Sequence, residues 1–333
     1  MGYSKGRSWS SSRSTLLTEC SRKAFFEYYS TSEPESYAVY NMKELSSLPM
    51  LKGEIVDIVI SAALQRVAWG EALPKNMATV GAKTFMEFVA ASPAIVAQMH
   101  RRARTTQARQ QSPHRALQSD YYDHDLGKEY EEMLADQVGT CLEIFQQSEV
   151  LEQILAIDPK YWGPFTRSLR TKPFFEIDGV RVYACFDFYL KDGRNLYILD
   201  WKTGFGSLRQ REAAEQQLKV YALYGARVLG IPKDQIYVQA VWLLDSADWE
   251  PQAVSSASLR LTEERIKAEV AAETARLTVF ESDLLQNEYW ADRADFPAKP
   301  SARGCTNCKY RDICEEGQRA CDHIIRRSQV CAI

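Results

Sequence analysis

Three β-rich runs between residues 172 and 202, joined by tight-turn signals, constrain the fold more than any other part of the sequence. The runs read KPFFEIDG, VRVYACFDFYL and NLYILDWK, and they are rich in aromatic and β-branched residues. The pair Asp178-Gly179 and the segment KDGR at 191–194 separate the runs, and Asp-Gly pairs favour hairpin turns. The pattern predicts three consecutive antiparallel strands.

The segments on either side of these runs predict helices. Apolar residues recur at helical spacing in 14–29, 53–69, 84–109 and 125–157, with a break expected near Pro93 and a loop at 110–124. After the strands we expect a helix at 209–229, a strand at 236–244 and a helix at 262–286. This order favours an α/β fold with a mixed central β-sheet flanked by helices over a doubly wound parallel sheet.

Composition limits the class of protein. With 333 residues, 45% of them hydrophobic, the chain can bury a sizeable core in one or two domains. No run of eighteen apolar residues occurs, and the polar start lacks the apolar stretch of a secretory signal, so we expect a soluble, cytoplasmic protein without a membrane partner. A net charge of −3 gives no general attraction to nucleic acid, so any DNA-binding surface requires a local concentration of Lys and Arg.

Acidic residues and one lysine gather in the β-rich block. Asp200 and Lys202 are two residues apart at the end of the third run, so in a strand both would project from one face. Asp187 lies in the second run and Glu176 in the first. Two interpretations remain open at this point: solvent-facing residues with a surface ion pair, or a site for Mg²⁺ or Mn²⁺ in which carboxylates bind the metal and the lysine orients a water.

The order of these residues resembles the PD-(D/E)XK nuclease superfamily, specifically its RecB-like branch. The resemblance is carried by Asp187, by DWKTG at 200–204, and by QQLKVYALY in the following helix, which provides a QxxxY motif at Gln217 and Tyr221. It implies a restriction-endonuclease-like core in which Asp187 and Asp200 bind the metal and Lys202 assists the nucleophilic water. It also implies that Gln217 and Tyr221 support the site or contact DNA.

Two further acidic positions are linked to this resemblance. Glu176 matches a frequent acidic position in the preceding strand. Members of the family often place a metal-binding histidine four residues after a glycine in the first core helix, but here Asp57 stands at that place after Gly53. Aspartate also ligates hard cations, so Asp57 is a candidate ligand, with Glu54 as a competitor and simple exposure to solvent as the alternative.

The eight cysteines point to metal binding more than to disulfides in such a chain. Cys305, Cys308 and Cys314 form a C-x2-C-x5-C run, and three thiolates need a metal or cluster to offset their charge. With a fourth cysteine, either tetrahedral Zn²⁺ or a cluster would fit, and that cysteine could be Cys20 or the nearby Cys321. Cys20 with the C-terminal trio is similar to RecB-like nucleases that carry a [4Fe–4S] cluster, which implies that these four residues hold one. The remaining cysteines are interpreted as plain buried or tail residues: Cys141, Cys185 and Cys331.

A basic segment provides the candidate surface for DNA. Five arginines without an intervening acid occur before the strands, namely Arg101, Arg102, Arg104, Arg109 and Arg115. They could neutralise phosphates of a single strand, or simply form a solvated face.

These observations predict a metal-dependent DNA nuclease, with an exonuclease acting on ends or single strands in repair, recombination or CRISPR-type processing as the expected type. One alternative is a weakly active or inactive DNA-binding scaffold subunit, and another is a subunit that acts only with a helicase or a CRISPR adaptation protein. The expected division of the chain is an N-terminal segment with the first cluster cysteine (1–52), a first core helix (53–72), a helical insertion (73–165), a nuclease core (166–295) and a C-terminal iron–sulfur segment (296–333).

Overall fold

The computed structural model describes residues 2–5, 7–30, 36–102, 115–163, 172–280 and 288–321. The strands are β1 (Gly2–Lys5), β2 (Ser8–Trp9), β3 (Phe174–Ile177), β4 (Val180–Tyr183), β5 (Phe188–Asp192), β6 (Asn195–Lys202), β7 (Ile236–Trp242), β8 (Gln252–Ala253), β9 (Leu277–Phe280) and β10 (Glu288–Ala291). The helices include α1 (Ser11–Glu19), α2 (Ser21–Tyr28), α3 (Ser36–Lys43), α4 (Leu48–Ala68), α5 (Met77–Arg102), α6 (Gln118–Tyr121), α7 (Lys128–Gln147), α8 (Glu149–Ala156), α9 (Leu208–Arg227), α10 (Ser256–Thr274) and α11 (Ala302–Thr306).

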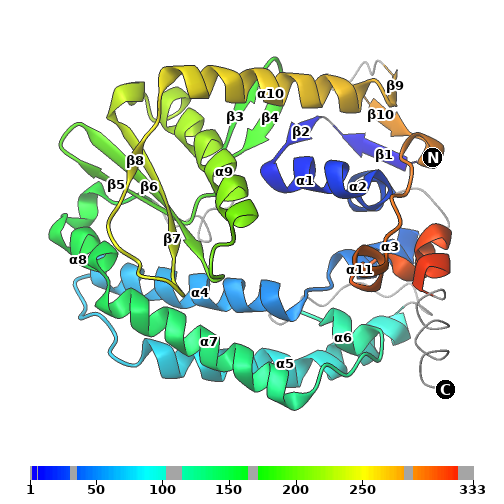
Figure 1. Ribbon diagram of the computed structural model, residues 1–333, viewed down its shortest axis with the longest axis horizontal. Coiled ribbons are helices and arrows are strands. Elements are labelled where there is room, and N and C mark those ends of the chain that lie inside the picture. The colour runs from blue at the N-terminus through cyan, green and yellow to red at the C-terminus, as the bar shows by residue number, and fades with distance from the viewer. Residues whose placement is uncertain are drawn as a thin grey trace.

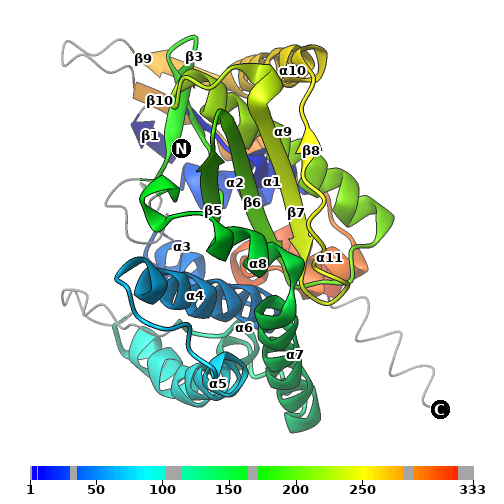
Figure 2. The same ribbon diagram turned by 90° about the vertical axis from the view of Figure 1, so that its left-hand side faces the viewer.

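A mixed four-stranded sheet in the order β5-β6-β7-β8 forms the centre of the fold. Strands β5 and β6 pair antiparallel, whereas β6 and β7 pair parallel because α9 carries the chain back between them. Figures 1 and 2 show the carboxyl ends of β6 and β7 pointing towards the helices α4 and α7. The mixed sheet with flanking helices confirms the predicted fold class.

The sheet separates two hydrophobic cores because its side chains alternate between its faces. Leu199 and Trp201 of β6 join a core with α4, α5, α7 and α8. Leu196 and Ile198 of the same strand join a second core with α9, α10 and the hairpin β3–β4. Almost every position of β6 is therefore dictated by packing, and Asp200 is a polar exception within it, only 4% exposed.

Both turns predicted from Asp-Gly pairs are present. Asp178 and Gly179 have left-handed backbone angles, φ 50° and 74°, and connect β3 to β4 with Ile177 opposite Val180. Gly193, with φ 58°, lies in the turn from β5 to β6. These local signals fix the register of each hairpin.

The three β-rich runs do not form three consecutive strands of one sheet. The run 180–190 is divided at residues 184–187, so the hairpin β3–β4 pairs with β2 in one sheet while β5–β6 belongs to the central sheet. Within the division, the Ala184 N–H donates to the Pro173 carbonyl at 2.9 Å and the Phe186 N–H to the Ala184 carbonyl at 3.1 Å. The first bond extends the β3–β4 ladder by one residue pair, and the second closes a three-residue turn. The chain therefore leaves this sheet after Ala184, and Asp187 precedes β5 instead of lying within a strand.

Several predicted helices have different bounds. The helix α5 continues through Pro93, because packing against α4 and α7 outweighs the lost backbone hydrogen bond. Ser148 caps α8 by accepting a hydrogen bond from the Leu151 N–H at 3.1 Å, and this cap divides the predicted helix 125–157 into α7 and α8. The short helix α6 lies in the predicted loop 110–124. The predicted helix 262–286 ends at Thr274, where β9 follows and pairs with β10; its residues 281–286 lie outside the described residues.

By length and composition alone, residues 77–101 of α5 could cross a membrane. A single such helix is weak support for a membrane span, because core helices meet the same test. Phe85 and Val89 of α5 are buried in the core that α4 and α7 share.

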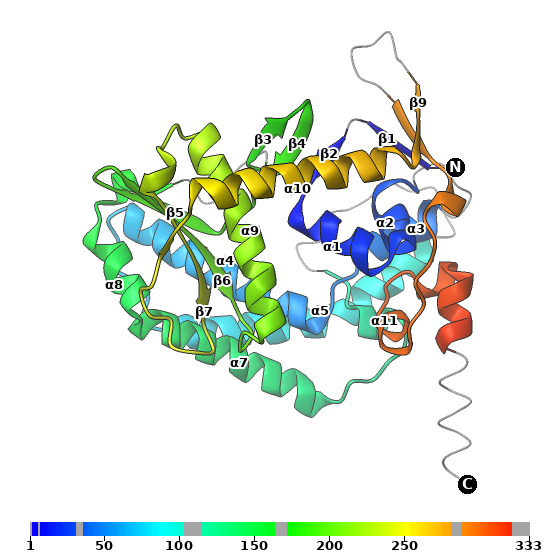
Figure 3. The ribbon, with the colours of Figure 1, turned by 45° about the horizontal axis from the view of Figure 1, so that its top comes forward.

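The first and the last segments that the structure describes lie side by side. The strands β1, β10 and β9 form a sheet, and α2, α3 and the C-terminal segment share a third core that contains Phe25, Phe26, Phe296 and Tyr310. Figure 3 shows α10 running from the region of the central sheet towards these terminal strands. The predicted single helix 14–29 is two helices, because Cys20 takes an extended conformation between α1 and α2.

A buried ion pair joins α10 to the N-terminal helices. Arg13 donates from Nε and Nη2 to Glu273 Oε1 at 3.1 and 2.8 Å, and the Tyr29 hydroxyl donates to the same oxygen at 2.8 Å. Only 5% of Arg13 and 7% of Glu273 is exposed. A buried charge without its partner is strongly disfavoured. Removing one partner of this pair should therefore destabilise the fold far more than removing one partner of a surface pair.

We expect Glu273→Ala to lower the free energy of unfolding by about 3–5 kcal/mol, because the Arg13 guanidinium would stay buried without its carboxylate. Urea denaturation followed by circular dichroism measures the change. The control is Glu87→Ala, which breaks the exposed pair with Lys83 and should cost less than about 1 kcal/mol. Equal losses in both variants would contradict this role of the buried pair.

Candidate active site

The hairpin β5–β6 places two carboxylates opposite each other at the edge of the central sheet. Phe188 pairs with Leu199, so Asp187 just before β5 lies across from Asp200 in β6. One oxygen of Asp187, Oδ2, accepts a hydrogen bond from the Trp201 N–H at 2.7 Å, which fixes this carboxylate against the neighbouring strand. Two acidic side chains are thus held together where β6 approaches α4.

Burial and like charge act together on this pair. Burial raises the pKa of Asp187 well above its ordinary value, and the charges of Asp200 and Asp57 raise it further. The pKa of Asp200 is also raised, mainly by burial, although the ammonium group of Lys202 opposes the shift. The protein therefore keeps two acidic groups in a place where their negative charge is disfavoured unless a cation offsets it.

A chain of hydrogen bonds holds Lys202. Its ammonium group contacts Asp200 Oδ2 and donates to Gln217 Oε1 at 2.9 Å. Gln217 Nε2 donates to the Tyr221 hydroxyl at 2.5 Å, and this hydroxyl donates to the Cys185 carbonyl at 2.7 Å. Both residues of the QxxxY pair thus support the lysine, and Tyr221 is 2% exposed, which leaves it no surface for direct contact with DNA.

Helix α4 brings the third carboxylate to the site. The charge of Asp57 acts on both Asp187 and Asp200, and its Oδ1 accepts a hydrogen bond from the Ser61 hydroxyl at 3.2 Å. Glu54, the competing candidate, forms an ion pair with Arg115 at 3.1 Å.

Glu176 does not join this group. It lies at an exposed position of β3, where it pairs with Arg181 of β4 in the sheet that does not contain the site. Its backbone carbonyl accepts a hydrogen bond from Arg227 Nη1 at 3.0 Å. The expectation that Glu176 lies beside the other carboxylates depended on a continuous meander, which the division at 184–187 prevents.

The chemistry of these donors fits a hard divalent cation. Three carboxylates, those of Asp57, Asp187 and Asp200, face one ammonium group, so an added cation would offset the remaining negative charge. Asp200 Oδ2 is buried and, apart from its ion pair with Lys202, has no hydrogen-bond partner in the described part of the chain. In the arrangement seen here, no three His, Cys, Asp or Glu side chains of the described residues lie close enough together to enclose a metal ion.

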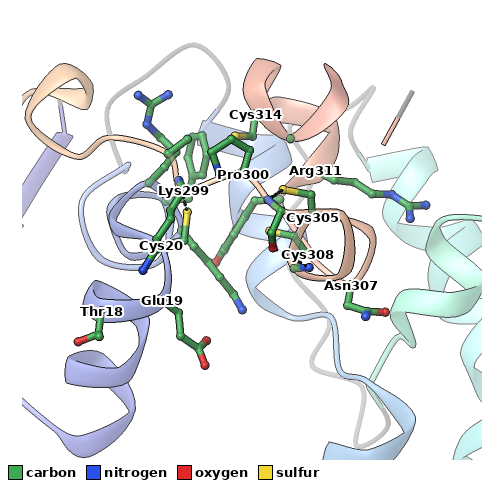
Figure 4. A pocket seen from close by; sticks show the side chains of 18 of the residues that line it. Thr18, Glu19, Cys20, Lys299, Pro300, Cys305, Asn307, Cys308, Arg311 and Cys314 are labelled. Carbon is green, nitrogen blue, oxygen red and sulfur yellow. Dashed lines mark hydrogen bonds between the residues drawn. The ribbon is translucent and has the colours of Figure 1, made fainter. Parts of the chain in front are cut away.

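The four cysteines that the sequence singled out share one cavity. A cavity of about 660 Å³ is lined by Cys20, Cys305, Cys308 and Cys314, and Figure 4 shows their side chains around it. The helix break at Cys20 turns this residue towards the C-terminal segment. Cys321, the alternative fourth ligand, is described by the structure but lies outside the lining of this cavity.

Two backbone groups of the segment 299–301 point at sulfur atoms of this cavity. The Lys299 N–H donates to Cys20 Sγ at 3.5 Å, and the Ser301 N–H donates to Cys305 Sγ at 3.4 Å. Burial raises the pKa of Cys308, and it raises the pKa of Cys314 to about 11. These two thiols would therefore stay protonated at neutral pH unless a bound metal displaced their protons.

The other cysteines and the basic segment lie elsewhere. Cys141 is buried in the core, Cys185 is exposed, and Cys331 lies outside the described residues. Arg101 is exposed at the end of α5, and Arg115 pairs with Glu54. Arg104 and Arg109 lie outside the described residues, as does the side chain of Arg102.

Four contributors to these sites could not be assigned from the sequence. The Trp201 N–H and the Cys185 carbonyl are backbone groups, which carry no signal in a sequence. Gly53 marks the place of Asp57 in the sequence, and a Cβ at Gly53 would lie 3.6 Å from Thr203 Oγ1, so α4 passes close to the turn after Lys202. Arg209 lines the cysteine cavity, and its only signal was its place in the first turn of the helix after DWKTG.

A comparison with protein families agrees with this geometry. The family model described as the PD-(D/E)XK nuclease superfamily matches residues 8–315, nearly the whole chain. No curated protein matches the sequence.

Proposed function

The chain belongs to the PD-(D/E)XK nuclease superfamily, and from this premise we propose that it is a metal-dependent deoxyribonuclease of the RecB-like branch, acting on DNA ends or single strands. Nucleases of this superfamily use divalent metal ions, and Mg²⁺ or Mn²⁺ is proposed here. One observation carries the proposal: Asp187 and Asp200 are buried side by side, and Lys202 is held against them by Gln217.

The carboxylates and the lysine of the site would have separate roles in hydrolysis. Asp187 and Asp200, with Asp57, would hold the metal, which supplies Lewis acidity to the phosphodiester and to the attacking water. An ammonium group has three N–H donors, and Asp200 and Gln217 account for two at Lys202, so the third can orient a water or a phosphate oxygen. Lys202 is thereby positioned to stabilise the negative charge that grows on the phosphate as water adds and the P–O bond breaks.

The proposal is tested by incubating the purified protein with end-labelled single-stranded and double-stranded DNA, with and without Mn²⁺. We expect cleavage only with the metal, and the sizes of the labelled products distinguish degradation from an end from internal cutting. An RNA strand of the same sequence tests the substrate class. Absence of cleavage under all these conditions would overturn the proposal.

The rival function is a DNA-binding scaffold that keeps the fold without catalysis. Asp57, standing where a histidine is common in the family, favours it, whereas a lysine that Gln217 holds beside two buried carboxylates favours catalysis. Binding of DNA without cleavage by the wild-type protein would favour the scaffold.

Replacing Asp57 tests its role as a ligand. We expect Asp57→Ala to need a roughly tenfold or higher metal concentration for half-maximal cleavage, because one carboxylate near the pair Asp187 and Asp200 is lost. Asp57→His should keep activity with a shift towards Mn²⁺, because imidazole suits a softer ion than Mg²⁺. Metal titrations of cleavage measure both, with Glu54→Ala as the control. An unchanged titration in Asp57→Ala would remove it from the ligand set.

We further propose that the cysteine cavity holds a [4Fe–4S] cluster through Cys20, Cys305, Cys308 and Cys314. Two observations support it: all four residues line one cavity, and backbone N–H groups point at two of their sulfurs, as is common around clusters. The cluster would tie the two ends of the chain together and would not take part in hydrolysis. A helicase or a CRISPR adaptation protein is proposed as partner, because this sequence contains no phosphate-loop motif of its own and any motor that unwinds DNA for the nuclease would be a separate protein.

A further inference from the structure

An exposed aromatic ring lies three residues after Lys202. Phe205 is 71% exposed in the turn between β6 and α9, although a side chain of this type gains most by burial. It is flanked by Gly204 and Gly206, so neither neighbour covers the ring with a side chain of its own.

The turn around Phe205 is held in place. Arg211 donates from Nε to the Gly206 carbonyl at 2.8 Å and from Nη2 to Asp245 Oδ2 at 2.8 Å. The Ser207 N–H donates to Gln210 Oε1 at 2.9 Å in a capping box. Gly206 has φ 68°, and a Cβ there would lie 2.9 Å from the Arg211 guanidinium. The hydrogen bonds of Arg211 to the Gly206 carbonyl and to Asp245 therefore require a glycine at this position. The ring is therefore presented to solvent by a fixed turn.

Along the chain, Phe205 lies between a residue next to the active site and a residue that belongs to a group of basic side chains. Thr203 lies against Gly53 of α4, the helix that carries Asp57. On the other side of Phe205, Arg209 lines the cysteine cavity together with Lys23 and Lys299. Phe205 thus lies between Lys202 and Arg209 along the chain, so a strand that contacts both residues would come near its exposed ring.

We propose that Phe205 stacks on an unpaired nucleobase of the strand being cut, next to the phosphodiester in the active site. This inference rests on the proposed nuclease function. Stacking on an aromatic side chain requires a base that has left its duplex, so Phe205 would favour single-stranded substrate at this position and would set where the strand lies relative to Lys202. Phe205 is thus a positioning residue for substrate, not a participant in the chemistry.

The test compares Phe205→Ala, Phe205→Leu and Phe205→Trp on single-stranded oligonucleotides in which one abasic nucleotide is placed at each position in turn. A stacked base is worth about 1–3 kcal/mol, so Phe205→Ala and Phe205→Leu should lower kcat/KM by roughly 5- to 150-fold on intact DNA, mainly through KM. Phe205→Trp should keep the wild-type value. The control is Leu208→Ala, which removes a neighbouring apolar side chain that is 77% exposed and should change kcat/KM by less than about twofold.

The abasic substrates separate stacking from a general effect on folding. At one position, removal of the base should weaken cleavage by the wild-type protein. On that substrate the wild type and Phe205→Ala should have the same kcat/KM, because the missing base and the missing ring delete the same contact. If Phe205→Ala cleaves intact single strands as well as the wild type, or loses the same factor on every abasic substrate, the inference is overturned while the nuclease stands. If the wild-type protein cleaves no nucleic acid with Mn²⁺, the proposed function falls and this inference falls with it.

Discussion

Lys202→Ala and Asp200→Ala are each expected to lower cleavage of DNA by about 10²- to 10⁴-fold, the usual size of the loss when a charge-stabilising or proton-handling group is removed. The reason is geometric. Lys202 is the cation that Gln217 holds beside the carboxylate pair, and Asp200 is the carboxylate it contacts. Asp187→Ala should behave in the same way. Rates of cleavage under single-turnover conditions, with saturating Mn²⁺, measure the loss of the chemical step itself.

Two controls separate loss of chemistry from loss of the fold. Asp192→Ala removes an exposed carboxylate from the other end of the hairpin β5–β6 and should leave cleavage within about twofold. Asp187→Asn removes one of two like charges buried together, so without metal its thermal midpoint should equal or exceed that of the wild type, while the increase in midpoint on adding Mn²⁺ should disappear. Cleavage at wild-type rates in both Lys202→Ala and Asp200→Ala would contradict the assignment of these residues to the active site.

The part of the site that could be predicted from the sequence is the part built by local structure. A hairpin with a short turn fixes its own register, so the pairing of β5 with β6 brings Asp187 opposite Asp200, whatever the rest of the chain does. The spacing of Gln217 and Tyr221, one helical turn apart, likewise places both on one side of α9, where they reach Lys202. Motif and geometry agree here because both depend on few, nearby residues.

The rest could not be predicted because tertiary contacts overrode local preference. Residues 184–187 lie inside a run that as a whole is rich in strand formers, yet they leave the ladder, and the Cys185 carbonyl accepts a hydrogen bond from Tyr221. The same division removes Glu176 from the site. Pro93 indicates a helix break that packing on α4 and α7 prevents, whereas Cys20 interrupts a segment whose periodicity predicts one helix. The approach of α4 to the sheet, which brings Asp57 in, is a long-range contact that local patterning does not indicate; only the family resemblance pointed to Asp57.

The active site and the cysteine cavity are linked by one short piece of chain. Residues 202–209 begin at the lysine beside the carboxylates and end at Arg209 in the lining of the cavity. An ordered cysteine segment would therefore fix one side of the path along which a strand reaches Lys202, even though the cysteines take no part in hydrolysis. A change at the cysteines is thus expected to weaken substrate binding as well as stability.

The largest effect on stability is expected from Cys20→Ser. Cys20 and the trio Cys305, Cys308 and Cys314 are almost three hundred residues apart in the sequence but line one cavity, so a shared cluster would close nearly the whole chain into a loop. In the chain-entropy description, closing a loop of that length stabilises the folded state by on the order of 5 kcal/mol. Protein purified without oxygen should be brown, with a broad absorbance band in the visible range, and Cys20→Ser should remove the colour and lower the thermal midpoint.

Cys321→Ser is the matched control, because this cysteine belongs to the same C-terminal segment but lies outside the lining of the cavity. It should keep both colour and thermal midpoint, as should Cys331→Ser. Analysis of iron, sulfide and zinc in the same samples decides the nature of the group. About one zinc per chain and no iron would refute the cluster and leave a four-thiolate zinc site in its place. If Cys20→Ser instead kept its iron and colour while Cys321→Ser lost them, the fourth ligand would be Cys321, and the N-terminal and C-terminal segments would be joined without the cluster, by the Phe25, Phe296 and Tyr310 core and by the pairing of β1 with β10.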